Sequence, residues 1–476
     1  MFKKILIANR GEIAVRVIRA CKDLGIKSVV IYSEADKESL HVKMADYAYE
    51  LEGDPIGVYL DKQQILKIAK LSEVEAIHPG YGFLSENADF ARQVQESGLV
   101  WIGPSAEIIE KMGDKNTARA LMKQSGIPIV EGTDPLNDKT PEEIFKIASK
   151  IGYPVILKAS AGGGGRGIRV IDDELSLLEG FEACKRESKA FFGNDDVFME
   201  KYVSSPRHIE FQIVADLYGN VIHLGERDCS IQRRHQKLIE IAPSPSIDEG
   251  LRRRMGAVAV AAAKAVGYTN IGTVEFLLDE RNQFYFMEMN TRIQVEHGVT
   301  EEITGIDLVV RQLRIAYGEI LELQQQDIQF QGYAIEARIN AEDARAEFAP
   351  SSGKIEVYYP ALGPSVRVDS CIYKGYEIPP FYDSMVAKLI VRATSYDLAI
   401  NKLSRALSEF TIKGVKTTIP FLKNICQDSV FRRGIFSTSY LASRLQDLIP
   451  QEEEDELDEI SAIAAVIAWK NQERDK

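Results

Sequence analysis

The sequence lacks the features of disulfide-stabilised, zinc-binding and membrane-spanning proteins. Its five cysteines are scattered along 476 residues and form no CxxC pair, which argues against a disulfide framework or a zinc site. No unbroken apolar stretch approaches the length of a membrane helix, and the first residues do not resemble a secretory signal with a cleavage site. We therefore expect a cytoplasmic protein whose thiols are reduced and mostly structural.

Positive charge is also scarce, because 58 Lys and Arg face 71 Asp and Glu and leave a formal net charge of -13. Such a surface repels nucleic acid and anionic membranes, so we expect neither as a partner. An anionic substrate would need a local basic pocket. With 476 residues, 45% of them apolar and 27% charged, the chain has the composition of a globular protein of two to four domains.

The first hundred residues alternate strand and helix patterns. An apolar run at 5–8 leads into a turn and a helical pattern, which Gly25 is placed to end, and a second apolar run follows at 28–32. This order predicts a parallel sheet with right-handed crossovers. The first turn contains one glycine, where a dinucleotide-binding fingerprint has three, so NAD binding is not favoured.

Two further blocks and a tail follow this sheet. The second block contains a glycine-rich segment and an alanine-rich helix at 251–266 that Gly267 ends. The third block begins near residue 332 and indicates an α+β domain. Its strand patterns lie at residues 333–339, 354–359 and 385–394. After residue 450, an acidic run precedes an amphipathic helical pattern, which we expect to dock on a partner chain or on the third block.

Two basic or glycine-rich segments are candidates for binding an anion. The glycine run at 161–167 follows an apolar strand that carries Lys158. Glycines let backbone N–H groups approach a phosphate, although the order is not that of a Walker A loop and a surface loop is the alternative. The lysine favours a phosphate-binding lid. The basic stretch at 232–237 suits a nucleotide or a carboxylated anion, although most such stretches are solvated loops.

Two strand patterns at 272–279 and 284–290 predict a β-hairpin. A two-residue turn at 281–282 would place Glu275 directly opposite Glu288. Like charges that face each other across a ladder are destabilising, and Mg²⁺ bridging the carboxylates and nucleotide phosphates would neutralise them. The alternative, in which both carboxylates point to water, is less favoured because the hairpin is mostly apolar.

Polar residues continue at every second position beyond this hairpin. They are Glu288, Asn290, Arg292, Gln294 and Glu296. An extended backbone would present them on one face, and their chemistry suits a site better than a core. Arg292 is suited to hold a planar oxyanion such as bicarbonate, and Glu296 to act as a general base.

Over nearly the whole chain, to about residue 445, these residues closely resemble the biotin carboxylase family, a branch of the ATP-grasp superfamily. The motifs that carry the resemblance are residues 8–14 (ANRGEIA), 78–87 (HPGYGFLSEN) and, most specifically, 288–297 (EMNTRIQVEH). The resemblance implies an α/β and α+β fold. It implies an N-terminal parallel α/β domain over 1–113, an ATP-grasp domain with a glycine-rich lid over 114–331, a C-terminal α+β domain over 332–447, and an acidic linker with an amphipathic helix over 448–476.

The resemblance also implies a role for each matching residue. ATP contacts are implied for Lys115, Lys158, Gly163, Gly164, Glu200, Lys201, Val203, His208, Gln232 and His235. Ligands of Mg²⁺ (or Mn²⁺) would be Glu275, Glu288 and Asn290. Bicarbonate would be held by Lys237, Arg292, Gln294 and the backbone of Val295. With Arg292 and Lys237 assisting, Glu296 would deprotonate bicarbonate and Arg338 would stabilise the enolate-like biotin anion, with carboxyphosphate formed first and CO₂ released beside biotin.

Departures from the family pattern are informative. Ala161 replaces a glycine of some members, and Gly298 follows the motif where proline is usual, which we expect to loosen the backbone there. No Ala-Met-Lys-Met segment occurs, so we expect the biotin on a separate biotin carboxyl carrier protein or biotinylated carboxyltransferase subunit. A homodimer is implied. The final carboxyl acceptor stays open among pyruvate, 2-oxoglutarate, acetyl-CoA and propionyl-CoA.

Two other functions compete with this interpretation. Another ATP-grasp ligase would join an acyl phosphate to an amine, and a regulatory subunit would bind nucleotide without catalysis. The row from Arg292 to Glu296, together with Arg338, favours the biotin carboxylase, and every expected catalytic residue is present.

Overall fold

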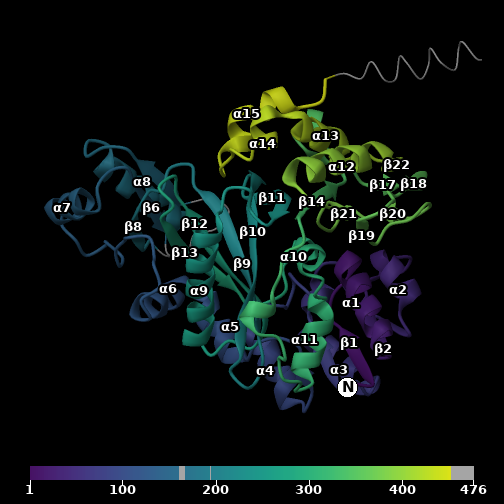
Figure 1. The fold of residues 1–476 in the computed structure, drawn as a ribbon. Coiled ribbons are helices and arrows are strands. Elements are labelled where there is room, and N and C mark those ends of the chain that lie inside the picture. The colour runs from purple at the N-terminus through teal and green to yellow at the C-terminus, as the bar shows by residue number, and fades with distance from the viewer. Residues whose placement is uncertain (160–166, 193–194, 452–476) are drawn as a thin grey trace, which may run out of the picture.

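The computed structural model describes residues 1–159, 167–192 and 195–451 (Figure 1). Gly163 and Gly164, for which ATP contacts are predicted, lie outside the described residues, and so does the predicted amphipathic pattern of the tail. Within the described residues, no helix is long and apolar enough to cross a membrane.

The described chain begins with a five-stranded parallel sheet of order β3-β2-β1-β4-β5. Its strands are β1 (Lys4–Ile7), β2 (Lys27–Tyr32), β3 (Tyr47–Glu50), β4 (Ala76–His78) and β5 (Val100–Trp101). The helical elements around them are α1 (Gly11–Asp23), η1 (Glu34–Asp36), α2 (Leu40–Met44), η2 (Gly57–Leu60), α3 (Lys62–Leu71), α4 (Ala88–Glu96) and α5 (Ala106–Gly113). Gly25 follows α1 with φ +70°, a left-handed conformation that ends the helix as predicted. The predicted parallel sheet is confirmed.

A small lid-like unit stands apart from this sheet, at the left of Figure 1. Its elements are α7 (Pro141–Ile151), β6 (Val155–Ala159), β7 (Ile168–Ile171), α8 (Leu177–Phe192) and β8 (Val197–Lys201). Helix α6 (Lys115–Gln124) leads into this unit but packs on α9 and β13. Apolar side chains of β6 and β8 pack against α7 and α8 on one face of the antiparallel sheet. Side chains alternate along a strand, so Lys158 and Glu200 lie on the opposite face.

An antiparallel sheet of eight described strands forms the centre of the molecule, with the order β13-β12-β9-β10-β11-β14-β21-β19. The strands are β9 (Arg207–Ala215), β10 (Val221–Arg233), β11 (Gln236–Ala242), β12 (Asn270–Leu278), β13 (Phe284–Asn290), β14 (Tyr333–Asn340), β19 (Val366–Ser370) and β21 (Met385–Ala393). Because β11 pairs with β14, the domain boundary predicted at residue 332 falls within one continuous sheet.

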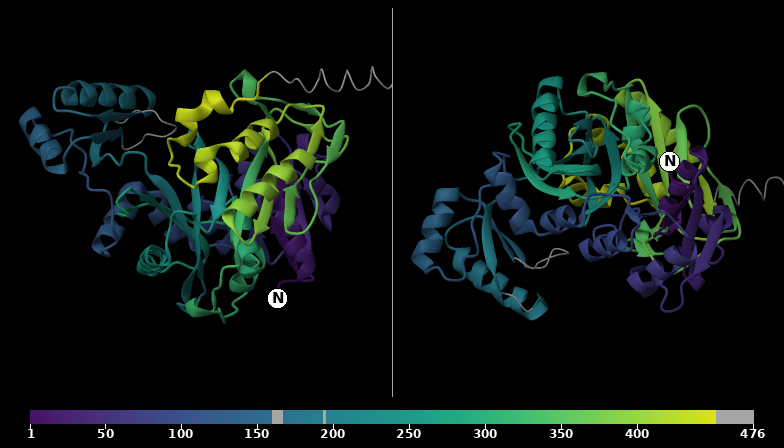
Figure 2. Two further views of the ribbon diagram at one scale, coloured as in Figure 1. Left: turned by 45° about the horizontal axis from the view of Figure 1, so that its top comes forward. Right: turned by 90° about the horizontal axis from the view of Figure 1, so that it is seen from below.

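Helices cover this sheet and connect it to the N-terminal sheet. They are α9 (Glu249–Ala265), α10 (His297–Thr304) and α11 (Leu308–Ala316). The alanine-rich helix α9 packs on β9, β10 and β12, and Gly267 follows it with φ +66°, as the sequence predicts. Helix α11 buries Leu308, Val309 and Leu313 in the same apolar core as α1 and β1. The two helices are in contact, and their ribbons lie side by side in both views of Figure 2.

The C-terminal elements surround the far end of the sheet. They are η3 (Gln325–Asp327), β15 (Glu342–Asp343), η4 (Ala344–Ala346), β16 (Ala349–Pro350), β17 (Gly353–Lys354), β18 (Val357–Tyr359), β20 (Glu377–Ile378), α12 (Tyr396–Glu409), β22 (Thr411–Lys413), α13 (Ile419–Gln427), α14 (Ser429–Arg432) and α15 (Tyr440–Leu448). The single strand predicted at 354–359 is wrong. Ile355 N–H donates to Tyr376 and Glu356 N–H to Lys413, so adjacent residues pair with different strands and the segment divides into β17 and β18.

Candidate functional site

One cavity of about 1940 Å³ is lined by residues from all three regions of the chain. Every site residue predicted from the sequence within the described part of the chain lines it. These residues are Lys115, Lys158, Glu200, Lys201, Val203, His208, Gln232, His235, Lys237, Glu275, Glu288, Asn290, Arg292, Gln294, Val295, Glu296 and Arg338. A cavity of this size and mixed polarity can accommodate a nucleotide together with a second substrate.

The hairpin of β12 and β13 places Glu275 directly opposite Glu288, as predicted. The turn, however, differs from the prediction. The N–H of Asp279 donates to the carbonyl of Gln283, so the loop contains three residues, and Asn282 adopts φ +59°. The extra loop residue shifts the pairing by one position, and a bulge beside Phe276 shifts it back. The predicted two-residue turn is therefore wrong, whereas the register at the carboxylates is right.

The two facing carboxylates have different surroundings. Glu275 accepts hydrogen bonds from His208 Nε2 at 2.6 Å and from Asn290 Nδ2 at 2.8 Å, and it lies 3.3 Å from Lys237 Nζ. Glu288 has no hydrogen bond or ion pair with the residues that the structure describes, and burial and the nearby Glu275 raise its pKa. A cation beside Glu288 would stabilise its ionised form, and carboxylate and amide oxygens are ligands that Mg²⁺ prefers. The donor set therefore fits this ion.

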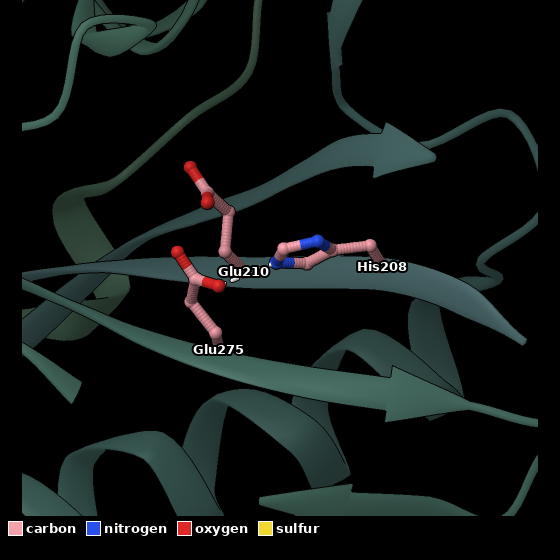
Figure 3. Close-up of side chains that lie close together, drawn as sticks. All are labelled: His208, Glu210 and Glu275. Carbon is pink, nitrogen blue, oxygen red and sulfur yellow. Dashed lines mark hydrogen bonds and ion pairs between the residues drawn. The ribbon is translucent and has the colours of Figure 1, made fainter. Parts of the chain in front are cut away.

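A second acidic group lies beside the hairpin (Figure 3). His208 and Glu210 project from β9 and Glu275 from β12, with their ligand atoms within 4.8 Å of one another. The carboxylate of Glu210 lies 2.5 Å from Arg227 Nε and 2.6 Å from Lys237 Nζ. The cations of the protein thus already compensate the charge of Glu210. We interpret Glu210 and Glu275 as the carboxylates that hold Lys237 in place.

Glu296 occupies the centre of the cationic part of the cavity. It is fully buried, with Oε1 2.6 Å from Lys237 Nζ and Oε2 2.9 Å from Arg338 Nη2. Burial alone would raise the pKa of Glu296, but Lys237, Arg338 and Arg227 hold it well below its usual range. The carboxylate is therefore held in its ionised form.

Arg338 bridges Glu296 to a second buried carboxylate. Its Nη2 lies 2.5 Å from Glu240 Oε1. Burial is the main cause that raises the pKa of Glu240 to about 7, with Glu296 adding to it and Arg338 opposing it. One guanidinium is thus held between two acids, which fixes its direction in the cavity.

The prediction that an extended backbone continues from Glu288 to Glu296 is wrong after Asn290. Strand β13 ends there, and Glu296 precedes α10 with φ -80° and ψ 14°. Glu86 binds the chain just after the strand ends. It accepts hydrogen bonds from Thr291 N–H at 3.2 Å and from Arg292 Nε at 2.9 Å. The side chains still converge. Arg292 Nη1 lies 3.0 Å from Gln294 Oε1, and its Nη2 lies 3.2 Å from Asn290 Oδ1.

Gly298 lies in the first turn of α10 and is buried. A Cβ atom at this position would lie 2.3 Å from Ile390 Cδ1 on β21. Close packing of α10 on the sheet therefore favours a residue without a side chain, and this packing holds the helix that Glu296 precedes.

The lid-like unit and α6 supply the other end of the cavity. Lys158 Nζ lies 2.5 Å from Glu200 Oε2, and Glu200 also accepts a hydrogen bond from Arg119. Lys115 occupies the first turn of α6. Lys201 differs from these lysines, because its Nζ donates to the carbonyls of residues 152 and 153 at 2.8 and 3.0 Å. Its ammonium group is therefore already hydrogen-bonded to the backbone of the protein.

Sequence reasoning assigned no role to several residues of this site. Glu210 was detectable, because His208, Glu210 and Gln212 show the same two-residue spacing as the polar row that starts at Glu288. Glu86 lies inside a recognised motif but has no local signal of its contact with Arg292. Arg119, Arg227 and Glu240 depend on strand and helix packing and have no such signal.

The comparisons with known proteins agree with this geometry. Three family models match the chain: "Biotin carboxylase, N-terminal domain" over residues 1–109, "Carbamoyl-phosphate synthase L chain, ATP binding domain" over 114–324, and "Biotin carboxylase C-terminal domain" over 336–443. The 2-oxoglutarate carboxylase small subunit of Hydrogenobacter thermophilus is 53% identical over 468 residues, with 98% of this chain and 99% of the relative covered. Biotin carboxylase 1 of Bacillus subtilis is 54% identical over 443 residues, with 93% and 98% covered.

Solved structures are similar over the same length. The biotin carboxylase domain dimer of the H. thermophilus 2-oxoglutarate carboxylase, in complex with MgADP, ADP and bicarbonate, matches with a TM-score of 0.88 and 53% identity. The match covers 95% of this chain and 100% of that chain. A biotin carboxylase subunit of pyruvate carboxylase matches with a TM-score of 0.86, 51% identity and the same coverage. The chain belongs to the biotin carboxylase family.

Proposed function

We propose that this cavity carboxylates biotin at the expense of ATP and bicarbonate, and that the biotin is held by a separate carrier chain. The observation that carries the proposal is the placement of Glu296 between Lys237 and Arg338, beside Arg292 in the same cavity. A buried, ionised base beside three cations suits a small oxyanion that must lose a proton.

The nucleotide end of the cavity is assigned to the lid-like unit and α6. Lys115 and Lys158 would contact the ATP phosphates, and the segment from Glu200 to Val203 would border the base. Glu275, Glu288 and Asn290 would hold Mg²⁺, which draws charge from the phosphates when bound. In the structure the ammonium group of Lys158 pairs with Glu200. When ATP binds, a phosphate group would replace the Glu200 carboxylate as the partner of this ammonium group.

The bicarbonate end is assigned to Arg292, Gln294, Val295 and Lys237. Bicarbonate placed there would share Lys237 with Glu296, which weakens the cation's hold on the carboxylate and raises its pKa. Glu296 would then accept the bicarbonate proton. The deprotonated oxygen of bicarbonate then attacks the γ-phosphorus of ATP. The bond between this phosphorus and the oxygen that bridges it to ADP breaks, and carboxyphosphate forms.

Arg338 is assigned to the biotin step. Carboxyphosphate would break into CO₂ and phosphate beside biotin, and the phosphate would accept the proton of the ureido nitrogen. The ureido group would then carry negative charge on its oxygen. The guanidinium, fixed by Glu240 and Glu296, can donate to that oxygen as the charge develops. The deprotonated nitrogen then attacks CO₂, which gives carboxybiotin.

The proposal also covers the domain boundaries, the partners and the location of the protein. The divisions at residues 113, 331 and 447 are proposed as domain boundaries. Two partners are proposed: a second copy of the chain, and a carboxylase subunit that bears the biotin. A cytoplasmic location is proposed because all five cysteines are buried and free, as expected in a reducing compartment. The relatives include carboxylases of both 2-oxoglutarate and pyruvate, so the acceptor is not assigned.

ATP turnover with Mg²⁺ and bicarbonate should rise strongly when free biotin is added. The physical reason is that biotin consumes the CO₂ formed beside Arg338 and so draws the preceding steps forward. ADP release in the four combinations with and without bicarbonate and biotin is the measurement. A turnover that needs an amine in place of biotin would identify another ATP-grasp ligase, and no turnover in any combination would favour a regulatory subunit.

Glu288→Gln should raise the Mg²⁺ concentration needed for half-maximal turnover about tenfold or more, because it removes one anionic ligand. The charge balance at Glu275 should stay intact, since His208 and Lys237 are retained. Titration of ATP turnover with Mg²⁺ is the measurement. Glu280→Gln, in the exposed loop of the same hairpin, is the matched control and should leave the titration unchanged. Equal midpoints for Glu288→Gln and wild type would refute the metal assignment.

A further inference from the structure

The loop that joins β13 to α10, residues 291–296, has two backbone carbonyls fixed by other parts of the protein. The carbonyl of Gln294 accepts hydrogen bonds from His297 N–H at 3.3 Å and from His297 Nδ1 at 2.8 Å. The carbonyl of Val295 accepts one from Lys388 Nζ at 2.7 Å. Both peptides that flank Val295 are therefore held, and a trans peptide whose C=O is fixed has its N–H fixed in the opposite direction.

Lys388 is completely buried in β21, beside Arg338 of β14 in the register of the central sheet. Its ammonium lies 3.2 Å from Glu12 Oε1 and 3.9 Å from Asp369 Oδ2. A buried lysine without counterions would be strongly destabilising, so these carboxylates are needed to keep it charged. Burial lowers its pKa, but Glu12, Glu336 and Asp369 together outweigh this effect and raise it.

Glu12 continues the connection to the N-terminal sheet. It lies in the first turn of α1, is buried, and accepts a hydrogen bond from the hydroxyl of Tyr81. Tyr81 lines the same cavity as Val295 and Glu296. Contacts thus run from the loop through Lys388 and Glu12 to Tyr81, and they join three regions that are far apart in the sequence.

We propose that Lys388 is a positioning residue of this enzyme: its ammonium group fixes the Val295–Glu296 peptide, and Glu12 fixes the ammonium. This inference rests on the proposed function, in which the Val295 backbone holds bicarbonate and Glu296 removes its proton. Lys388 does not itself touch the substrate. It sets the direction of the peptide that joins Val295 to Glu296.

The position of Lys388 predicts that its loss affects one substrate and not the other. The nucleotide end of the cavity is built from α6, β6 and β8, which Lys388 does not contact, whereas the bicarbonate loop depends on it directly. Loss of the ammonium should therefore harm bicarbonate use and leave nucleotide binding in place. A lysine that served only to stabilise the fold would not distinguish between the two ligands.

The test compares Lys388→Met with wild type in bicarbonate-dependent ATP turnover and, separately, in calorimetric binding of MgADP. We expect kcat/KM for bicarbonate to fall about 100-fold, the effect of a misplaced reacting group. The Kd for MgADP should change by no more than about twofold, as for distant independent sites. Lys388→Arg, which keeps the charge and the donor, should recover part of the lost kcat/KM.

Lys402→Met is the matched control. This half-buried lysine also donates to backbone carbonyls, of Arg392 at 2.7 Å and of Pro364 at 3.2 Å, but it lies outside the cavity lining. Its removal should leave kcat/KM for bicarbonate unchanged. If Lys388→Met fails to fold, the double variant Glu12→Gln/Lys388→Met removes both charges of the pair and should show the same selective loss.

The outcomes separate this inference from the proposed function. Absence of bicarbonate-dependent turnover in the wild type would contradict the function itself. Normal turnover in the wild type, combined with unchanged kcat/KM for bicarbonate in the folded variants, would overturn the role of Lys388. Equal losses in bicarbonate use and MgADP affinity would also overturn it, because they indicate general structural damage.

Discussion

Glu296→Gln should lower kcat for bicarbonate-dependent ATP turnover by about 10²–10⁴-fold, the usual contribution of a positioned general base. Glutamine has the same shape but accepts no proton at neutral pH. It also removes a fully buried negative charge between Lys237 and Arg338, so the two cations lose a shared partner. Lys237 keeps Glu210 and Glu275, and Arg338 keeps Glu240, so the cavity should stay intact.

Steady-state kinetics and MgADP binding by calorimetry are the measurements for this variant. MgADP binding should remain close to that of wild type, which locates the loss in the chemical step. Glu301→Gln is the matched control. Glu301 is also buried in α10 and paired with arginines, Arg16 at 2.8 Å and Arg367 at 2.7 Å, but it does not line the cavity. Its substitution should lower stability and leave kcat nearly unchanged. Similar kcat losses in both variants would contradict the role of Glu296.

Arg338→Ala should lower kcat for carboxylation of free biotin by about 10²–10³-fold, the effect of losing one donor that stabilises developing charge. The bicarbonate-dependent ATP turnover measured without biotin should fall much less, because the guanidinium is assigned to the later step. Removal of Arg338 also leaves Glu240 and Glu296 without their shared cation. A loss of stability of about 3–5 kcal/mol is therefore expected alongside the kinetic effect.

Two further variants separate the kinetic effect of Arg338 from the loss of stability. Arg338→Lys keeps a charge between the two acids, so it should fold better than Arg338→Ala while still losing the planar fork. Arg252→Ala is the matched control, since Arg252 also pairs with a buried carboxylate, Glu226 at 2.8 Å, outside the catalytic cavity. Thermal unfolding and carboxybiotin formation are the measurements. Normal carboxylation by Arg338→Ala at saturating ATP would contradict the assignment.

The sequence was sufficient to predict the parallel N-terminal sheet and the helices that glycines end. The apolar strands of that sheet and the residues Gly25 and Gly267 are local signals, because a left-handed residue ends a helix wherever it occurs. The motif 288–297 likewise indicated residues that line the cavity. Each of these inferences depends on neighbours in the chain, which is why no structure was needed to make them.

The hairpin shows a prediction that was right for an incorrect reason. The register of Glu275 and Glu288 follows from a three-residue loop and a bulge whose effects cancel. The bulge lies outside residues 280–283, and these four residues do not show by themselves which of them form the loop. The strand predicted at 354–359 failed similarly, since the change of partner depends on β20 and β22.

The sequence by itself determined the chemistry of this protein: which acids, bases and cations are present, and which short segments present them. The tertiary structure alone decided which of them meet. Glu240, Glu210 and Lys388 lie 56, 86 and 92 positions from Glu296. Glu210 and Lys388 reach the site because β9 and β21 enter one sheet, and Glu240 because β11 pairs with β14. A charge acts over a few ångströms whatever the separation along the chain, so only the folded arrangement brings these groups to Glu296, to the cations beside it and to the loop that precedes α10.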